Sequence, residues 1–279
     1  MIVRPRTLCF VLLLVCGCRP HAPGRSDSAQ AYAQLSDILY RDSLDQALST
    51  SMERQCRLDL YYPVDRSGYA TIVWFHGGGL IGGEKSIPDA LRNRGWAVVA
   101  ANYRLSPEVF APAYIEDAAA AVAWVFQHIS EYGGDPERVI VSGHSAGGYL
   151  ASMVGLDKRW LAAYGIDANA IAAVVPFSGH AITHFTIRKE RGIPETQVVV
   201  DDLAPLYHVR ADAPDYVMIT GDRDLELLGR YEENAYMWRM MQQAGNTRAV
   251  LHEIKGAGHS SMVDRGMRIL IEYLKARHF

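Results

Sequence analysis

Runs of β-branched and aromatic residues alternate along the chain with segments that have the hydrophobic spacing of helices. The runs lie at Leu58–Tyr62, Thr71–Phe75, Ala97–Ala101, Arg138–Val141, Ala172–Val175, Tyr216–Thr220 and Ala249–Ile254, and each has the length of one strand. Helices are predicted over Ser86–Arg94, Ile115–Ile129, Ala146–Leu156, Leu225–Ala244 and Met262–Ala276. This alternation predicts an α/β domain with a mostly parallel central sheet and helices on both faces.

Two segments lack this alternation. Residues 31–53 are polar and amphipathic and are interpreted as one or two helical turns. Residues 177–210 form the longest irregular segment and lie between two predicted strands. Because ligands of open α/β sheets bind at the carboxyl ends of the strands, a segment in this position is expected to cover the site as a small cap.

The first 18 residues have the pattern of an export signal. Arg4 and Arg6 precede an apolar run, Leu8–Val15, which is far too short to cross a bilayer as a helix. The sequence that follows ends in Cys16-Gly17-Cys18 and resembles a bacterial lipobox, although Cys16 is an uncommon residue at its position. The resemblance implies lipidation of Cys18, and a plain secretory signal is the alternative.

These features divide the chain into three expected parts. Residues 1–17 are predicted to be a signal peptide, residues 18–35 a flexible tether and residues 36–279 the folded domain. The protein is therefore expected to be exported, as a periplasmic or outer-membrane-anchored lipoprotein attached to the membrane through Cys18. Cys56 is then the one remaining unmodified cysteine, so no internal disulfide is expected.

Charge and composition narrow the class of partner. The chain has 279 residues, 49% of them hydrophobic, which is sufficient for one large α/β domain. The formal net charge is −3 and no run of basic residues occurs. Nucleic acid is therefore not an expected partner.

The segment after the fourth predicted strand has the pattern of a nucleophile elbow. Gly143-His144-Ser145-Ala146-Gly147 is a G-x-S-x-G sequence between a strand and a helix. In such a turn the serine Oγ stands at the helix N-terminus, where the dipole and free N–H groups favour negative charge. Ser145 is the candidate nucleophile, and the alternative is a glycine-rich turn whose serine only caps the helix.

A second glycine-rich segment, "TIVWFHGGGLIGGEK" at Thr71–Lys85, follows an early predicted strand. Gly78–Gly83 has the glycine spacing of a phosphate-binding P-loop, but Glu84 stands where that motif requires lysine and Lys85 comes one residue late. The loop is interpreted instead as the oxyanion side of a hydrolase, where bare glycine backbone can approach a substrate carbonyl. His76 is interpreted as a structural residue of this loop.

A serine nucleophile needs a general base, which a carboxylate orients. His259 lies in the glycine-rich loop "KGAGHSSM" after the last predicted strand, whereas His252 falls inside that strand. His259 is therefore the candidate base. The loop "GDRDLE" after the sixth predicted strand offers Asp222, Asp224 and Glu226 as the acid, and spacing alone does not choose among them.

Several motifs together resemble the α/β-hydrolase superfamily. They are "HGGG" (76–79), "NYRLSPE" (102–108), "GGDPERVIVSGHSAGG" (133–148), "GDRD" (221–224) and "GHS" (258–260). Within the superfamily the chain is similar to carboxylesterases of the hormone-sensitive-lipase-like group and to feruloyl esterases of the dienelactone-hydrolase-like type. The resemblance covers about residues 56–279 and implies an α/β-hydrolase fold for the domain.

The resemblance also implies roles for single residues. The family's acid is the last residue of a G-x-x-D pattern, which is Asp224, and its base corresponds to His259. Its oxyanion donors correspond to the N–H groups of Gly78, Gly79 and Ala146. The implied reaction is hydrolysis of a small-molecule carboxylic ester through an acyl-enzyme, which requires no metal and no organic cofactor.

Two alternative functions remain at this point. An amidase or arylformamidase could use the same triad, because leaving-group preference depends on the shape of the pocket. Leu80 stands where relatives often have an aromatic residue, so the shape of the acyl pocket is open. A non-catalytic binding protein with a hydrolase fold is the other alternative, although such proteins usually lose a member of the triad and this chain retains a candidate for each.

Overall fold

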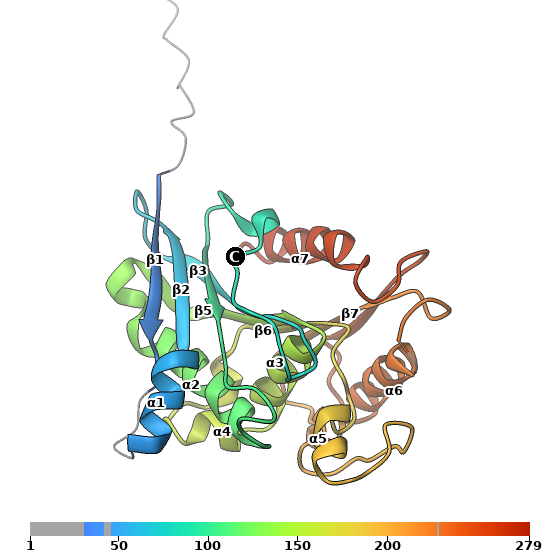
Figure 1. The fold of residues 1–279 in the computed structure, drawn as a ribbon. Helices are drawn as coiled ribbons and strands as arrows, with labels where there is room; N and C mark the ends of the chain where they lie inside the picture. The colour runs from blue at the N-terminus through green and yellow to red at the C-terminus, as the bar shows by residue number, and fades with distance from the viewer. Residues whose placement is uncertain (1–30, 42–45, 228) are drawn as a thin grey trace, which may run out of the picture.

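Residues 31–41, 46–227 and 229–279 are described by the computed structural model, and within them eight strands form one sheet in the order β1-β2-β4-β3-β5-β6-β7-β8 (Figure 1). The strands are β1 Tyr32–Leu39, β2 Arg57–Pro63, β3 Tyr69–Phe75, β4 Ala97–Ala101, β5 Gly134–His144, β6 Ala173–Phe177, β7 Asp215–Gly221 and β8 Ala249–Ile254. β1 and β2 are antiparallel to their neighbours, and the strands from β4 to β8 are mutually parallel. The prediction of a mostly parallel sheet is confirmed.

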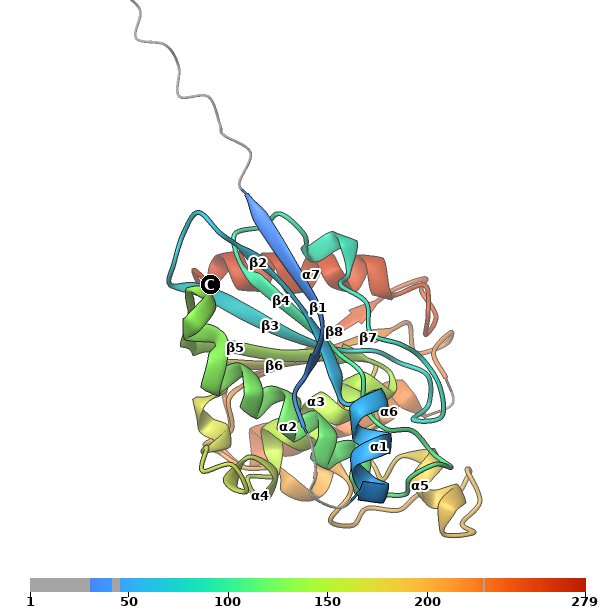
Figure 2. The ribbon, with the colours of Figure 1, turned by 60° about the vertical axis from the view of Figure 1, so that its left-hand side comes forward.

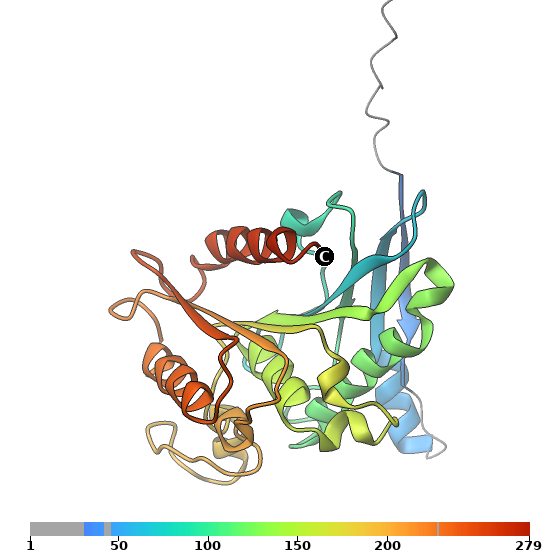
Figure 3. The same ribbon diagram turned by 180° about the vertical axis from the view of Figure 1, so that it is seen from behind.

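Helices cover both faces of this sheet. They are α1 Gln46–Gln55, α2 Ala113–His128, α3 Ala146–Leu156, α4 Arg159–Ala162, α5 Phe185–Glu190, α6 Arg230–Gln243 and α7 Val263–Ala276. In Figure 1, and from behind in Figure 3, α7 lies on one side of the sheet and α2, α3 and α6 lie on the other. This layering is typical of doubly wound α/β domains.

The central strand β3 shows how the sequence divides the core between the two faces. All seven of its residues are buried. Val73 and Phe75 pack in the hydrophobic cluster with α2 and α3, whereas Ile72 and Trp74 pack in the cluster with α7. Because successive side chains of a strand point to opposite faces, one continuous apolar run supplies both cores.

The N-terminal part of the described chain corrects two expectations. The helical turns predicted within residues 31–53 are confirmed from Gln46 onward, in α1, but residues 32–39 are a strand, since β1 pairs with β2 from Tyr32 opposite Pro63 to Leu39 opposite Arg57 (Figure 2). The folded domain therefore includes residues that were assigned to the tether at 18–35. The sequence did not predict this strand because it lies at the sheet edge and its four central residues are exposed. An exposed strand does not need the apolar positions by which a buried strand is recognised. The predicted signal peptide and Cys18 lie outside the described residues.

Two predicted helices also differ from the structure. Within Ser86–Arg94 only a 3-10 turn forms, at Asp89–Leu91. Pro88 disfavours helical backbone at the residue before it, and Arg92 is already extended, with φ −71° and ψ 148°. Helix α6 begins at Arg230 and not at Leu225, because Gly229 has a φ of 75° and ends the preceding loop.

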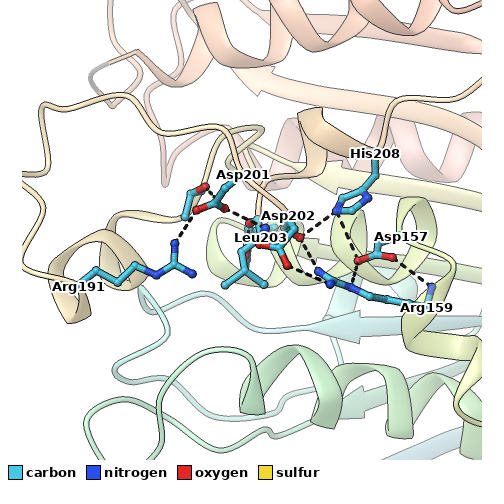
Figure 4. Close-up of polar contacts among 9 residues, drawn as sticks. Asp157, Arg159, Arg191, Asp201, Asp202, Leu203 and His208 are labelled. Carbon is cyan, nitrogen blue, oxygen red and sulfur yellow. Dashed lines mark hydrogen bonds and ion pairs between the residues drawn. The ribbon is translucent and has the colours of Figure 1, made fainter.

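The irregular segment predicted as a cap contains α5 and lies near the carboxyl ends of the strands (Figure 1). Figure 4 shows how two adjacent carboxylates fasten its second half. Asp201 accepts hydrogen bonds from Thr183 Oγ1 at 2.7 Å and Arg191 Nη1 at 2.5 Å. Asp202 accepts from Arg159 Nη1 at 3.0 Å, which joins the segment to α4.

No helix among the described residues is long and apolar enough to cross a membrane.

Candidate active site

Ser145 occupies a strained turn between β5 and α3. Its φ of 56° and ψ of −116° are unusual for a residue with a side chain. A Cβ atom on Gly143 would lie 2.6 Å from the carbonyl oxygen of Phe75, and one on Gly147 would lie 2.1 Å from the same oxygen. The predicted strand–turn–helix context, and the need for glycine on both sides of the serine, are confirmed.

His259 lies beside this turn although it follows Ser145 by more than a hundred residues. The Nε2–H group of the neighbouring His144 donates to the carbonyl oxygen of His259 at 2.9 Å, and the centroids of the two rings are 4.7 Å apart. Burial, together with the charge of His259, lowers the pKa of His144 to about 4. His144 is therefore a neutral hydrogen-bond donor that positions the loop of His259 against the elbow.

Glu226, and not Asp224, is the carboxylate that contacts His259. His259 Nδ1 lies 2.6 Å from Glu226 Oε1. The side chain of Asp224 is exposed, and its backbone N–H donates to Asp222 Oδ1 at 3.0 Å, which forms a tight turn. The assignment of Asp224 as the acid is therefore corrected: the turn directs that carboxylate outward and brings the longer side chain of Glu226 inward.

The Glu226 carboxylate is buried and fully hydrogen-bonded. Its side chain is only 1% exposed. Besides His259, the N–H of Leu227 donates to Oε1 at 2.9 Å, and Ser178 Oγ and the N–H of Gly221 donate to Oε2 at 2.7 Å and 3.1 Å. Burial acts to raise the pKa of Glu226, but these donors outweigh it and lower the pKa to about 2. The group is an anion across the physiological range.

The residues around Glu226 contain a signal that sequence reasoning missed. A Cβ on Gly221 would lie 2.6 Å from the carbonyl oxygen of Ala257 and 2.9 Å from Glu226 Oε2. The glycine that opens "GDRDLE" is thus required by the backbone of the loop before His259 and by the Glu226 carboxylate. Ser178, directly after β6, also contacts His259 Nδ1 at 3.0 Å. A serine at the end of the neighbouring parallel strand was the available clue, since strand ends converge.

The HGGG loop lies against the elbow. A Cβ on Gly77 would be 3.2 Å from the carbonyl oxygen of His144 and 3.4 Å from Ser145 Cβ. Gly78 and Gly79 have φ values of 114° and 65°, which turn the chain sharply. Within the described ranges, no hydrogen bond is formed by the N–H groups of Gly78, Gly79 or Ala146.

His76 anchors the start of this loop. Its ring is stacked on that of Tyr103, with centroids 4.4 Å apart, and the Tyr103 hydroxyl donates to the His76 carbonyl at 2.9 Å. Burial lowers the pKa of His76, so the ring is neutral. These contacts agree with the structural role expected for His76.

Two cavities adjoin the loop and the acid. The surface of one, of 550 Å³, is mostly apolar, and its lining includes Ile81, Pro107, Phe110 and Phe185 together with the charged side chains of Lys189, Glu190 and Glu195. The other, of 330 Å³, is lined by Phe185, Leu227, the exposed side chains of Glu195 and Thr196, and a group of buried polar side chains. Among the residues that the structure describes, no group of three or more His, Cys, Asp or Glu side chains is placed to hold a metal ion.

Comparison with known families agrees with this geometry. The sequence model of the BD-FAE family matches residues 58–228, which is more than half of the chain. The chain belongs to the BD-FAE family. The match extends from β2 to the loop after β7 that contains Glu226, and it includes the glycine-rich loop and the elbow. The resemblance to α/β-hydrolase carboxylesterases is therefore confirmed.

Curated relatives of this BD-FAE protein carry esterase names. It is 37% identical over 153 residues to the probable carboxylic ester hydrolase LipM of Mycobacterium tuberculosis, covering 48% of this chain and 35% of LipM. It is 28% identical over 231 residues to the esterase LipQ of the same organism, covering 74% of this chain and 52% of LipQ. The chain thus spans about half or less of the length of these relatives.

Solved structures show the same fold. A truncated form of a carbohydrate esterase from gut microbiota has a TM-score of 0.70 and 19% identity, covering 90% of this chain and 98% of that one. Thermogutta terrifontis esterase 2, phosphoramylated by tabun, has a TM-score of 0.68 and 24% identity, covering 87% of this chain and 94% of that one. The α/β-hydrolase fold is therefore established for the BD-FAE domain.

Proposed function

We propose that the protein is a serine carboxylic-ester hydrolase whose triad is Ser145, His259 and Glu226. The observation that carries the proposal is the 2.6 Å contact between His259 Nδ1 and the buried Glu226 carboxylate, beside a strained serine turn. A nucleophile, a ring nitrogen and an orienting anion are the three groups that this chemistry requires.

In the first half-reaction Ser145 Oγ attacks the carbonyl carbon of the ester, and its proton moves to Nε2 of His259. Glu226 keeps Nδ1 protonated and stabilises the imidazolium that forms. The tetrahedral intermediate then collapses, and the alcohol leaves with the proton from His259. The product is an ester between the acid part of the substrate and Ser145.

In the second half-reaction water replaces the alcohol. His259 removes a proton from the water as it attacks the acyl-enzyme, and the same proton returns to Ser145 Oγ when the free acid leaves. The anionic oxygen of both intermediates lies against the N–H groups of Gly78, Gly79 and Ala146. Their lack of other acceptors among the described residues supports this role, and losing one such donor typically costs ~10²–10³ in turnover.

The ligands bound in similar solved structures support a small ester as the substrate. Thermogutta terrifontis esterase 2 is described in forms bound to propionate and butyrate, and phosphorylated by paraoxon. The apolar cavity beside the oxyanion loop, with Ile81 and Phe110 at its exposed wall, fits an acyl or alcohol group of modest size.

The test is hydrolysis of 4-nitrophenyl acetate by the purified protein and its covalent labelling by paraoxon. We expect mass spectrometry to place the phosphoryl group on Ser145, and Ser145→Ala to lose both labelling and hydrolysis while it keeps the wild-type thermal transition. Hydrolysis by Ser145→Ala at the wild-type rate would exclude the triad.

We also propose that the chain is a lipoprotein anchored through Cys18. Tyr32 pairs with Pro63 at the amino ends of the parallel strands, whereas Ser145 follows the carboxyl end of β5. An anchor before β1 would therefore attach to the domain at the end of the sheet opposite the candidate site. Incorporation of labelled palmitate by the wild type and its loss in Cys18→Ala is the expected result; equal incorporation would exclude this anchor.

A further inference from the structure

A cluster of buried polar side chains lies beside the candidate triad. Arg188 on α5, Arg230 at the start of α6 and His180 between β6 and α5 are 3%, 2% and 5% exposed. All three line the 330 Å³ cavity. Burying charged groups is costly unless each finds a partner, so the hydrogen-bonding of this cluster indicates what the cavity accepts.

The cavity adjoins both halves of the catalytic machinery. On one side Phe185 lies against the oxyanion loop, since a Cβ on Gly79 would be 3.1 Å from Phe185 Cζ. On the other side Leu227 lines the cavity, and its N–H donates to Glu226. The cavity therefore lies between the oxyanion loop and the loop that contains Glu226.

Both arginines donate hydrogen bonds to backbone carbonyl groups and also have N–H donors that are not used in these bonds. Arg188 Nη1 donates to the carbonyl oxygens of Glu195 at 2.7 Å and Gln197 at 2.5 Å, and Arg230 Nη1 donates to that of Ser178. In the described part of the chain, the Nε atoms of both arginines have no hydrogen-bond partner. A guanidinium has five N–H donors and no acceptor, so the pair calls for an acceptor-rich partner.

The nearby carboxylate of Glu233 is engaged elsewhere. It accepts from His180 Nδ1 at 2.8 Å and from the N–H of Ala181 at 3.0 Å. Among the described residues, no carboxylate lies within ion-pairing distance of either Arg188 or Arg230, and the Glu233 carboxylate is hydrogen-bonded to the uncharged ring of His180. The two guanidinium groups thus remain without a direct counterion.

His180 offers a hydrogen-bond acceptor, whereas the two arginines offer only donors. Because Nδ1–H donates to Glu233, the uncharged ring carries a lone pair on Nε2. Burial and the neighbouring charges of Arg230 and Arg188 keep the pKa of His180 well below its usual range, so the ring stays uncharged. Its Nε2 has no partner among the described residues and can accept a hydrogen bond from a hydroxyl.

We propose that this cavity binds a hydroxylated carboxylate on the ester substrate, with Arg188 and Arg230 facing the carboxylate and His180 accepting from an adjacent hydroxyl. The inference rests on the proposed ester hydrolysis and names its substrate class, an ester of a hydroxy acid or sugar acid. The apolar cavity on the other side of Phe185 receives the other part of the ester. Paired guanidinium groups are suited to a carboxylate because their donors match its two oxygens.

Two matched substrate pairs test the carboxylate. One pair differs in the acyl part, mono-4-nitrophenyl succinate against 4-nitrophenyl butyrate, and the other in the alcohol part, 4-acetoxybenzoate against 4-acetoxybenzamide. We expect the wild type to favour the charged member of at least one pair by about tenfold in kcat/KM, the usual effect of one charge-assisted hydrogen bond. Arg188→Gln should abolish that preference, whereas Arg239→Gln, which removes an exposed charge from α6, should keep it.

The outcomes separate this inference from the function on which it rests. Hydrolysis of neutral and charged esters without preference, or an equal loss for both members in Arg188→Gln, would overturn the carboxylate site while leaving the hydrolase intact. Failure to hydrolyse any of the four esters, together with no labelling by paraoxon, would overturn the hydrolase itself.

Inhibition of the wild type provides a measurement that needs no variant. D-galacturonate and D-galactose differ by one carboxylate and carry the same ring hydroxyls. We expect the acid to inhibit hydrolysis of 4-nitrophenyl acetate competitively with an inhibition constant at least about tenfold lower than that of the sugar. Equal inhibition constants would contradict the site even if Arg188→Gln failed to fold.

Discussion

His259 Nδ1 lies 2.6 Å from Glu226 Oε1, and the side chain of that glutamate is 1% exposed. The carboxylate that orients the candidate base is therefore two residues later than the one the family pattern indicates. The exposed Asp224 sits on the preceding turn, with its N–H bonded to Asp222. This relationship gives the sharpest test of the proposed triad.

Glu226→Gln should lower kcat strongly, on the order of 10³–10⁴, because the neutral amide cannot stabilise the imidazolium and favours the wrong tautomer of His259. Asp224→Asn is the matched control and should stay within about threefold of the wild type, since an exposed charge has little effect on the site. Steady-state kinetics on 4-nitrophenyl acetate check both. A reversed order of effects would restore Asp224 as the acid.

Glu226 should also affect acid stability. Its folded pKa, about 2, lies below the usual 4.5. A depressed carboxylate pKa stabilises the fold above the unfolded pKa, and this contribution is lost as the pH falls through the folded pKa. The free energy of unfolding of the wild type should therefore exceed that of Glu226→Gln at pH 7, and the difference should shrink between pH 4.5 and pH 2. Urea denaturation at several pH values measures it, and a constant difference would contradict the assignment.

Ser178 is expected to be a positioning residue. Its hydroxyl donates to Glu226 Oε2 at 2.7 Å and lies 3.0 Å from His259 Nδ1. Ser178→Ala should lower kcat about tenfold with little change in KM, because it removes one hydrogen bond to the charged Glu226 and frees the ring of His259 to move. It should also shift the acid limb of the pH–rate profile. A loss confined to thermal stability, with the profile unchanged, would show that Ser178 is only structural.

Gly147→Ala should prevent correct folding of the elbow. The new Cβ would lie 2.1 Å from the carbonyl oxygen of Phe75, which belongs to the sheet and cannot move away. We expect a loss of several kcal/mol, about the size of a severe core disruption. Gly82→Ala is the control, since nothing lies within 4 Å of its Cβ and its φ is not positive. Thermal denaturation compares the two, and equal transitions would contradict the steric account of the G-x-S-x-G motif.

The sequence by itself determined the layered sheet, the elbow and the candidate base. β3, β6 and β7 are short, mostly apolar runs whose residues are all buried, so local composition marks them without further context. Ser145 and its glycines form a local turn, and His259 is in the loop that chain order requires. Each of these predictions depends on a short segment of neighbouring residues, and the structure confirms the strand–turn–helix arrangement of the elbow.

Only the tertiary structure decided which carboxylate faces His259, where the domain begins and what lines the cavity. Asp222, Asp224 and Glu226 all lie in the short loop after β7, and the choice among them depends on a turn closed by Gly256 and Ala257 from another loop. β1 becomes a strand only because β2 offers it an edge. Arg188 and Arg230 line one cavity although they are 42 positions apart in the chain, and no local pattern in the sequence records that proximity.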